Sequence, residues 1–385
     1  MQKVRLGFLG VGPRAQSLID CYQNHPQVEF VAFADIAHNL ADKVCKEYNE
    51  KYQKDAKAYT CYEDMMKDAK MDALLIGIDP DKQVDYAVDA MHKGLHVMTE
   101  VPAAYTIDEC WKLVNAVKQT GCKYTIAEQT RYWNFINEWR KMNAAGEFGK
   151  IYYAEGEYLH YERYWDNLRH KVTNLPKCAN DPSEMNDPDY IPSWRHTTFL
   201  EPILYLPHEL SPLLSITGGR IEKVSCFGTR PTSYAEPHFD YTDIQTALMY
   251  NSNDVIFSLR AGFSAPYGKK SKTSAHWYQL KGSKATVESC RSTLDTMKLY
   301  RAGGEWEAMD WGTRDPSQPD HIRNATHGGA DFYPIIHFID SIVNDKTPPV
   351  DVYTAVETAA PAIKAAESAR LGGILLEVPD FRDKK

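Results

Sequence analysis

Residues 4–15 read Val4-Arg5-Leu6-Gly7-Phe8-Leu9-Gly10-Val11-Gly12-Pro13-Arg14-Ala15, and this stretch decides the fold. A short apolar run enters a G-x-G-x-x-[GA] sequence, and a helical pattern follows from about Arg14 to Cys21. The next strand-like run, residues 28–35, ends on an acidic residue, Asp35. A strand, a glycine turn, a helix and a second strand ending on an acid are typical of a dinucleotide-binding βαβ unit.

The same alternation of strand-like and helical segments continues through the first third of the chain. Later strand-like runs lie at 73–78, 96–101 and 124–127, and helical patterns lie between them at 84–93 and 107–118. Strands that alternate with helices indicate a parallel sheet with helices on both faces. We therefore expect an α/β fold whose N-terminal domain, residues 1–127, is a doubly wound Rossmann sheet.

After about residue 150 the pattern changes to strands with few helical intervals. The strand-like segments are 151–160, 221–227, 244–250, 255–261 and 277–280. This pattern favours an open, mostly antiparallel sheet in a second α/β domain, residues 128–385. From Asp331 two helices, split by Pro348-Pro349, are expected to pack back on the body. Residues 161–199 have no clear period and predict a long functional loop.

Composition and charge narrow the possible partners. The net charge of −8 repels polyanions, so we expect no nucleic-acid partner. No apolar run approaches the roughly 20 residues of a membrane-spanning helix. The first strand begins directly after Met1-Gln2-Lys3, and the eight cysteines are scattered without zinc-site spacing. We expect a cytoplasmic protein with free thiols, no metal site and no membrane contact.

The glycine turn predicts how a cofactor is held. Gly10 allows the tight turn, Gly12 lets the backbone approach a pyrophosphate, and Ala15 permits close helix packing. Asp35 would accept hydrogen bonds from the adenosine ribose and repel a 2′-phosphate, which favours NAD over NADP; Arg14 beside the phosphates weakens that preference. The expected cofactor-binding residues are Gly10, Gly12, Pro13, Arg14, Asp35, Ile78, Glu100, Val101 and Gln129.

Three features together resemble one known family: residues 7–15, the strand ending at Asp35, and Glu100-Val101-Pro102. The chain is similar along most of its length to the Gfo/Idh/MocA oxidoreductases, which include glucose–fructose oxidoreductase and inositol dehydrogenase. The resemblance implies an open sheet that forms a homodimer or homotetramer. Two departures concern acid–base chemistry. Val101 replaces the lysine usual in this family, and only His208 remains of a second usual motif expected at 204–211.

A branch of this superfamily, the NAD-dependent glycosidases of glycoside hydrolase family 109, also carries Glu-Val-Pro. Tyr158-Leu159-His160 and Tyr205-Leu206-Pro207-His208 resemble two further motifs of that branch. The resemblance implies that Tyr158 is a base at carbon and that His208 handles the oxidised hydroxyl, with Tyr205 and His160 assisting. It also implies a sugar pocket that contains Trp194, Arg195 and His327.

The sequence thus predicts an NAD-dependent enzyme that removes a hydride from a sugar hydroxyl carbon. In the glycosidase interpretation this oxidation serves cleavage of a glycosidic bond, and NAD is recycled. One alternative is a simple sugar or cyclitol dehydrogenase that releases NADH. Another, of a different class, is a regulator that binds NAD without turnover. The sugar and its linkage stay open.

Overall fold

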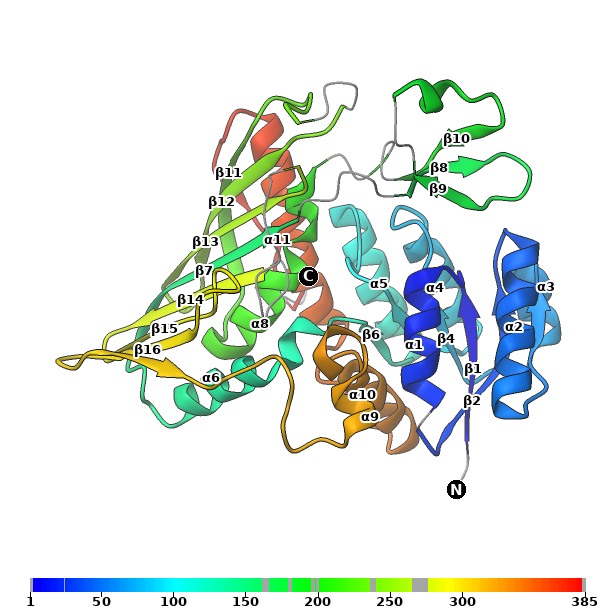
Figure 1. Cartoon of the computed structure of the whole chain (residues 1–385), viewed down its shortest axis with the longest axis horizontal. Helices are drawn as coiled ribbons and strands as arrows, with labels where there is room; N and C mark the ends of the chain where they lie inside the picture. Colours follow the sequence, from blue (N-terminus) through cyan, green and yellow to red (C-terminus); the bar gives the residue numbers. More distant parts are fainter. Residues whose placement is uncertain are drawn as a thin grey trace. The chain divides into compact units, whose positions relative to one another are not determined.

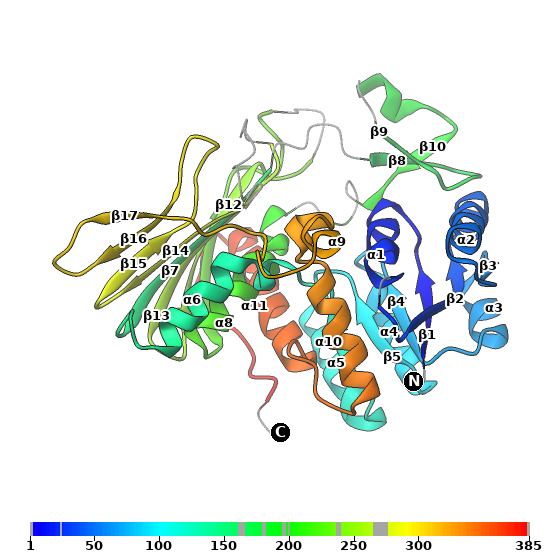
Figure 2. The same cartoon turned by 60° about the horizontal axis from the view of Figure 1, so that its bottom comes forward.

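The structure of the chain is a computed structural model that describes residues 3–23, 25–160, 166–178, 182–194, 198, 201–235, 240–264 and 276–382 (Figures 1 and 2). Contacts group the chain into two compact units. Unit 1 comprises Met1–Ala127, Tyr164–Thr198 and Asp331–Ala355, and unit 2 comprises Glu128–Arg163, Phe199–Ala330 and Val356–Lys385. Two later segments therefore group with the N-terminal part, and the units differ from the single division at residue 127 expected from the sequence.

Unit 1 contains a six-stranded parallel sheet in the order β3-β2-β1-β4-β5-β6, which confirms the expected doubly wound architecture. Its strands are β1 (Val4–Leu9), β2 (Val28–Ala34), β3 (Lys57–Tyr59), β4 (Ala73–Ile76), β5 (His96–Thr99) and β6 (Tyr124–Ile126). The central strand β4 is buried at every position, because helices cover both faces of the sheet.

The helices of unit 1 connect these strands. They are α1 (Pro13–Gln23), α2 (His38–Tyr52), α3 (Tyr62–Asp68), α4 (Gln83–His92), α5 (Ile107–Thr120) and, from much later in the chain, α10 (Phe332–Val343). Helix α5 begins with a capping box between Thr106 and Glu109 and ends at the left-handed Gly121. Helix α10 packs against α1, β1 and β6, which is why residues 331–355 belong to this unit.

Most of the described residues within the expected 161–199 loop form secondary structure. A small antiparallel sheet has the order β10-β8-β9, formed by β8 (Asp166–His170), β9 (Pro176–Cys178) and β10 (Tyr190–Pro192), with the 3₁₀ turn η2 (Pro182–Asn186). Strands of three to five residues are too short to show a period in the sequence, so the expectation of one continuous loop was wrong.

Two contacts attach this small sheet to the parallel sheet of unit 1. Arg169 forms an ion pair with Asp79 (Nη2 to Oδ1, 2.8 Å), and the Asn174 side chain donates to the Ile36 carbonyl at 3.2 Å. Ile36 follows β2 and Asp79 follows β4. The small sheet is therefore attached at the carboxyl ends of the parallel strands, the edge where α/β sheets bind ligands.

Unit 2 is built on a nine-stranded sheet in the order β17-β16-β15-β14-β7-β13-β12-β11-β18. Only the pair β7–β13 is parallel, which confirms the expected, mostly antiparallel sheet. The strands are β7 (Ile151–Leu159), β11 (Ile221–Gly228), β12 (Ile244–Asn251), β13 (Val255–Gly262), β14 (His276–Gly282), β15 (Ala285–Glu288), β16 (Met297–Arg301), β17 (Trp306–Met309) and β18 (Leu376–Glu377).

Helices α6 (Asn134–Ala144), α8 (Pro207–Thr217) and α11 (Val352–Arg370) lie along one face of this sheet (Figures 1 and 2). Shorter helical segments of unit 2 are α9 (Asp320–Arg323), η1 (Thr130–Tyr132), η3 (Pro202–Tyr205) and η4 (Thr326–Gly329). Apolar side chains that include Phe227, Leu248 and Ile256 are exposed on the sheet strands. The homo-oligomer implied by the family resemblance stays a prediction.

Among the described residues, no helix has both the length and the apolar character needed to cross a membrane.

Gly156 in β7 leaves the space that α8 occupies. A Cβ at this position would lie 2.8 Å from Cγ of Glu209 and 3.1 Å from a methyl carbon of Leu259. We expect Gly156→Ala to lower the free energy of unfolding by about 1–3 kcal/mol through overpacking, measured by urea denaturation. Gly312→Ala is the matched control, because a Cβ there would have no neighbour closer than 3.9 Å. Equal stability of the two variants would contradict this packing.

Candidate active site

The glycine turn of unit 1 has the geometry that its sequence predicts. Gly10 has φ +86°, and a Cβ there would collide with the carbonyl group of Gly77. Gly12 has no atom within 4 Å of the position that a Cβ would take, so the turn is open at that point. The Val11 N–H donates to Oδ2 of Asp35 at 2.9 Å, and the Ala37 N–H donates to Oδ1 at 2.8 Å. These two bonds fix the Asp35 carboxylate at the end of β2.

These residues fit a dinucleotide. The first turn of α1 follows directly after Gly12, and the early N–H groups of a helix have no partner within the helix. Together with the helix dipole they form a site for a pyrophosphate beside the open glycine. Asp35 is half-buried and its oxygens retain lone pairs for ribose hydroxyls.

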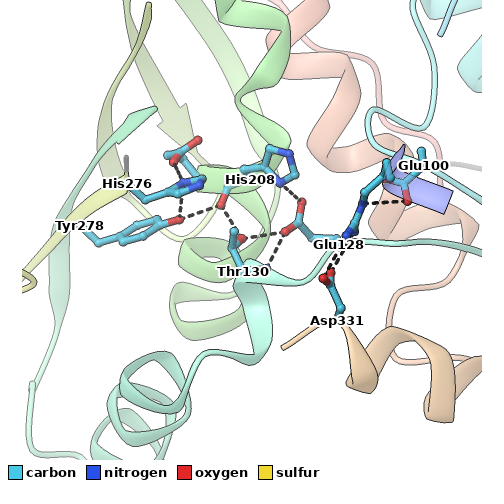
Figure 3. Close-up of polar contacts among 9 residues, drawn as sticks. Glu100, Glu128, Thr130, His208, His276, Tyr278 and Asp331 are labelled. Atoms are coloured by element: carbon cyan, nitrogen blue, oxygen red, sulfur yellow. Dashed lines mark hydrogen bonds and ion pairs between the residues drawn. The ribbon is translucent and has the colours of Figure 1, made fainter. Parts of the chain in front are cut away.

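Arg14 lies differently from what the sequence predicts. Its guanidinium forms two parallel hydrogen bonds with Asp331, both 2.9 Å, and its Nε lies 3.2 Å from Oε1 of Glu100 (Figure 3). Burial lowers the pKa of Arg14, but the charges of Glu100 and Asp331 outweigh burial and raise its pKa above the ordinary value. Arg14 is thus a fully charged group held by two carboxylates, rather than a free cation for phosphates.

The remaining expected cofactor residues lie near the ends of the strands. Ile78 follows β4, and both it and Val101 are half-buried. The Gln83 side chain donates to the backbone carbonyls of Glu100, at 3.3 Å, and of Pro102, which fixes the loop after β5. Gln129, which belongs to unit 2, is buried, and its amide oxygen has no hydrogen-bond partner among the described residues.

Unit 2 brings the four expected catalytic side chains together around Tyr158, near the end of β7. The ring of Tyr158 lies 4.3 Å from that of His160, and it stacks on Tyr205 and His208 with centroid distances of 5.3 Å each. Tyr205 ends η3, and His208 lies in the first turn of α8. Tyr158 is only 7% exposed and His208 is also buried, whereas His160 and Tyr205 are half-buried, so two phenols and two imidazoles meet at a partly enclosed site.

A buried carboxylate lies beside the imidazole of His208. Oε2 of Glu128 lies 2.8 Å from Nδ1 of His208, and the Glu128 side chain has no solvent exposure (Figure 3). Its other oxygen accepts the Thr130 N–H at 2.8 Å. Since a carboxylate carries no proton of its own, this close contact favours the tautomer with the proton on Nδ1, which leaves the lone pair on Nε2. This is the arrangement in which an imidazole acts as a general base.

A second buried carboxylate–imidazole pair lies beside the first. Oε1 of Glu209 lies 2.6 Å from Nδ1 of His276, and the His276 ring is edge-on to Tyr158 at 4.8 Å. The Tyr278 hydroxyl donates to the His208 carbonyl at 3.0 Å (Figure 3). Burial, together with the charges of Glu209 and Glu128, raises the pKa of Tyr278 well above its ordinary value, so this phenol stays a donor. The two pairs are thus joined through the backbone of His208.

The structure describes two of the three expected sugar-binding residues. Trp194 is half-buried and belongs to unit 1. Arg195 lies outside the described residues. The His327 side chain is exposed, and its contribution to unit 2 is a backbone carbonyl that accepts the Trp133 indole N–H at 3.0 Å. Their role as sugar ligands stays a prediction.

Sequence reasoning missed four residues of these networks: Glu128, Glu209, His276 and Asp331. His276 had a usable signal, because His276 and Tyr278 alternate on one face of β14, and His276 pairs directly with Tyr158 on β7. Glu128 follows the last Rossmann strand, and no sequence spacing connects it with His208, 80 positions later.

Comparison with known proteins gives two family matches. Residues 4–128 match the model of the oxidoreductase family with an NAD-binding Rossmann fold, Gfo/Idh/MocA. Residues 317–385 match the C-terminal domain of glycosyl hydrolase 109.

Relatives and solved structures span nearly the whole chain. An alpha-N-acetylgalactosaminidase of Tannerella forsythia is 26% identical over 98% of this chain and 86% of its own length, and a glycosyl hydrolase family 109 protein of Streptomyces filamentosus is 27% identical over 98% and 77%. The aldose–aldose oxidoreductase of Caulobacter crescentus has the same fold, with a TM-score of 0.72 at 18% identity over 98% of this chain and 100% of that one. Residues 4–128 thus form a Gfo/Idh/MocA-type NAD-binding Rossmann domain, and residues 317–385 match a glycosyl hydrolase 109 C-terminal domain.

Proposed function

We propose that this enzyme is an NAD-dependent glycosidase that oxidises a sugar, cleaves its glycosidic bond by elimination and then reduces the product. The observation that carries the proposal is the ring cluster of Tyr158, His160, Tyr205 and His208, in which Tyr158 and His208 are buried and Glu128 lies 2.8 Å from Nδ1 of His208. The name of the Tannerella relative makes α-linked N-acetylgalactosamine the first substrate class to test.

The dinucleotide is held by unit 1 in this proposal. The turn at Gly10 and Gly12 and the first turn of α1 bind the pyrophosphate, and Asp35 binds the adenosine ribose and disfavours a 2′-phosphate. When bound, the nicotinamide supplies hydride acceptance from a sugar carbon and its later return. The cofactor is therefore NAD and is not consumed over a full cycle.

His208 handles the proton of the oxidised hydroxyl. Its Nε2 takes that proton as the carbon becomes a ketone, and returns it when the carbon is reduced again. Glu128, 2.8 Å from Nδ1, stabilises the imidazolium that forms between these events. The buried Thr130 N–H keeps the carboxylate itself in place.

Tyr158 acts at the neighbouring carbon. A ketone acidifies the adjacent C–H bond, and Tyr158 removes that proton while the electron pair expels the glycosidic oxygen one carbon further along. Because the leaving group is on C1, the acidified carbon is C2 and the oxidised carbon is C3. Water then adds across the C1–C2 double bond, with its oxygen on C1 and a proton on C2. His160, at 4.3 Å, and Tyr205, at 5.3 Å, assist from either side.

The runner-up is a simple sugar or cyclitol dehydrogenase. A dehydrogenase needs one acid–base residue at the hydroxyl and none at the neighbouring carbon. It would therefore not use the second acid–base residue of the cluster. Val101 in place of the usual lysine also removes the residue on which such a dehydrogenase would rely. The clustered phenols therefore favour the glycosidase.

The decisive experiment uses the purified full chain with trace NAD⁺ and a panel of nitrophenyl glycosides that includes the α-N-acetylgalactosaminide. We expect nitrophenol release over many turnovers without a net rise in absorbance at 340 nm. Stoichiometric NADH would instead support the dehydrogenase. NAD binding with neither signal would support a non-catalytic regulator.

We expect Glu128→Gln to lower kcat about 100-fold with little change in KM, because an amide would donate to Nδ1 and move the proton to Nε2. Steady-state kinetics over a range of pH tests this, since the limb of the profile that reports His208 should move as well. Glu155→Gln is the control, because it removes a carboxylate of unit 2 that pairs with Arg260. It should leave kcat and the pH profile unchanged. A Glu128→Gln enzyme with normal kcat would remove Glu128 from this role.

Tyr158→Phe should abolish exchange of the C2 hydrogen with deuterated solvent, because the phenol oxygen that carries the proton is gone. Exchange is followed by mass spectrometry of the sugar recovered from the reaction, whether it is still the intact glycoside or has been released. Oxidation at C3 should persist in this variant, so a single turnover with stoichiometric NAD⁺ should still produce absorbance at 340 nm. Exchange at the normal rate would show that another group is the base.

A further inference from the structure

Arg14 is held by two carboxylates at the start of α1, and this network has no task in the chemistry proposed above. Asp331 accepts hydrogen bonds from both Nη atoms at 2.9 Å, and Oε1 of Glu100 forms an ion pair with Nε at 3.2 Å (Figure 3). The Asp331 side chain is completely buried, whereas Arg14 and Glu100 keep 31% and 21% exposure. Arg14 and Glu100 thus form the solvent-exposed side of the network, and Asp331 lies on its buried side.

The network carries a net negative charge. Two carboxylates and one guanidinium sum to −1, and Arg14 stays charged because its carboxylate partners raise its pKa. The nearest charged groups along the same strand ends are Asp35, held by two backbone N–H groups, and Asp79, paired with Arg169 and Lys82. Without Asp331, Arg14 and Glu100 would neutralise each other.

The network also lies where unit 1 binds a dinucleotide. Arg14 is the second residue of α1, directly after the open glycine turn, and Glu100 follows β5 at the carboxyl edge of the sheet. The oxidised and reduced dinucleotides bind with the same phosphates and riboses, and they differ by one positive charge on the nicotinamide. A fixed negative charge near this edge therefore favours the oxidised form over the reduced one.

We propose that Asp331 is a positioning and charge-setting residue, which by adding a second carboxylate to Arg14 biases unit 1 toward NAD⁺ over NADH. The inference rests on the proposed function in that it takes the dinucleotide to be NAD. A bias of this kind keeps the resting enzyme in the form that can accept a hydride, which an enzyme that recycles its cofactor needs at the start of each cycle.

The test measures dissociation constants of NAD⁺ and NADH for the full chain by protein and NADH fluorescence, without substrate. Asp331→Asn keeps the shape and can still accept from Arg14, but it removes one negative charge. We expect the ratio of the NADH to the NAD⁺ dissociation constant to fall about fivefold, the order expected of one unit charge acting through protein. Arg14→Gln removes the positive charge, so the same ratio should move in the opposite direction.

Asp72→Asn is the matched control. Asp72 also forms a two-bond pair with an arginine, Arg5, in the same unit, but Arg5 lies at the amino end of β1. This control should leave the ratio unchanged. If the ratio of the two dissociation constants is the same in wild type, Asp331→Asn and Arg14→Gln, with binding retained, this inference is overturned and the proposed function is not. Failure of the wild type to bind either dinucleotide would overturn the proposed function with it.

Discussion

The buried contact between Glu128 and His208 is the interaction on which the proposed chemistry depends. A fully buried carboxylate is costly unless its oxygens are hydrogen-bonded, and here one oxygen contacts Nδ1 of His208 while the other accepts the Thr130 N–H. The contact therefore favours the arrangement in which the imidazole proton is on Nδ1, toward Glu128. That arrangement leaves Nε2 of His208 as a base and fixes the ring against Tyr158.

This chain lacks several acid–base groups that are usual in the family it resembles. Val101 stands where an ammonium group is usual, and Leu204 and Ser211 stand where carboxylates are usual. Unit 2 supplies carboxylates instead from Glu128, after the last Rossmann strand, and from Glu209, in α8. In the proposed chemistry, oxidation first acidifies the C–H bond, so that a phenol or an imidazole suffices as the base at that carbon.

Much of the fold could be predicted from the sequence because its signals are local. The glycine turn at 10–15, the acid at Asp35 and the period of each strand depend on neighbouring residues, and the structure has these elements within one to three residues of their expected bounds. Tyr158 and His160 were predictable partners for the same reason, since they alternate on one strand. The short strands of the 166–192 segment carry too few residues for a period, and they were missed.

The supporting contacts of the site could not be predicted, because they join distant parts of the chain. Glu128 and His208 are 80 positions apart, and Arg14 and Asp331 are 317 positions apart. Arg14 shows the consequence for function. Next to a glycine turn, a lone arginine indicates a phosphate ligand, and only the structure shows that two carboxylates already hold it.

The central claim is that one carbon of the sugar loses a hydride and regains the same hydride within a single turnover. The most direct measurement uses an α-N-acetylgalactosaminide deuterated at C3, cleaved in ordinary water in the presence of unlabelled NAD⁺, with the released sugar analysed by mass spectrometry and NMR. The account predicts that the product keeps deuterium at C3. Cleavage of the glycoside with the C3 label lost, or with no isotope effect and no involvement of NAD⁺, would contradict it.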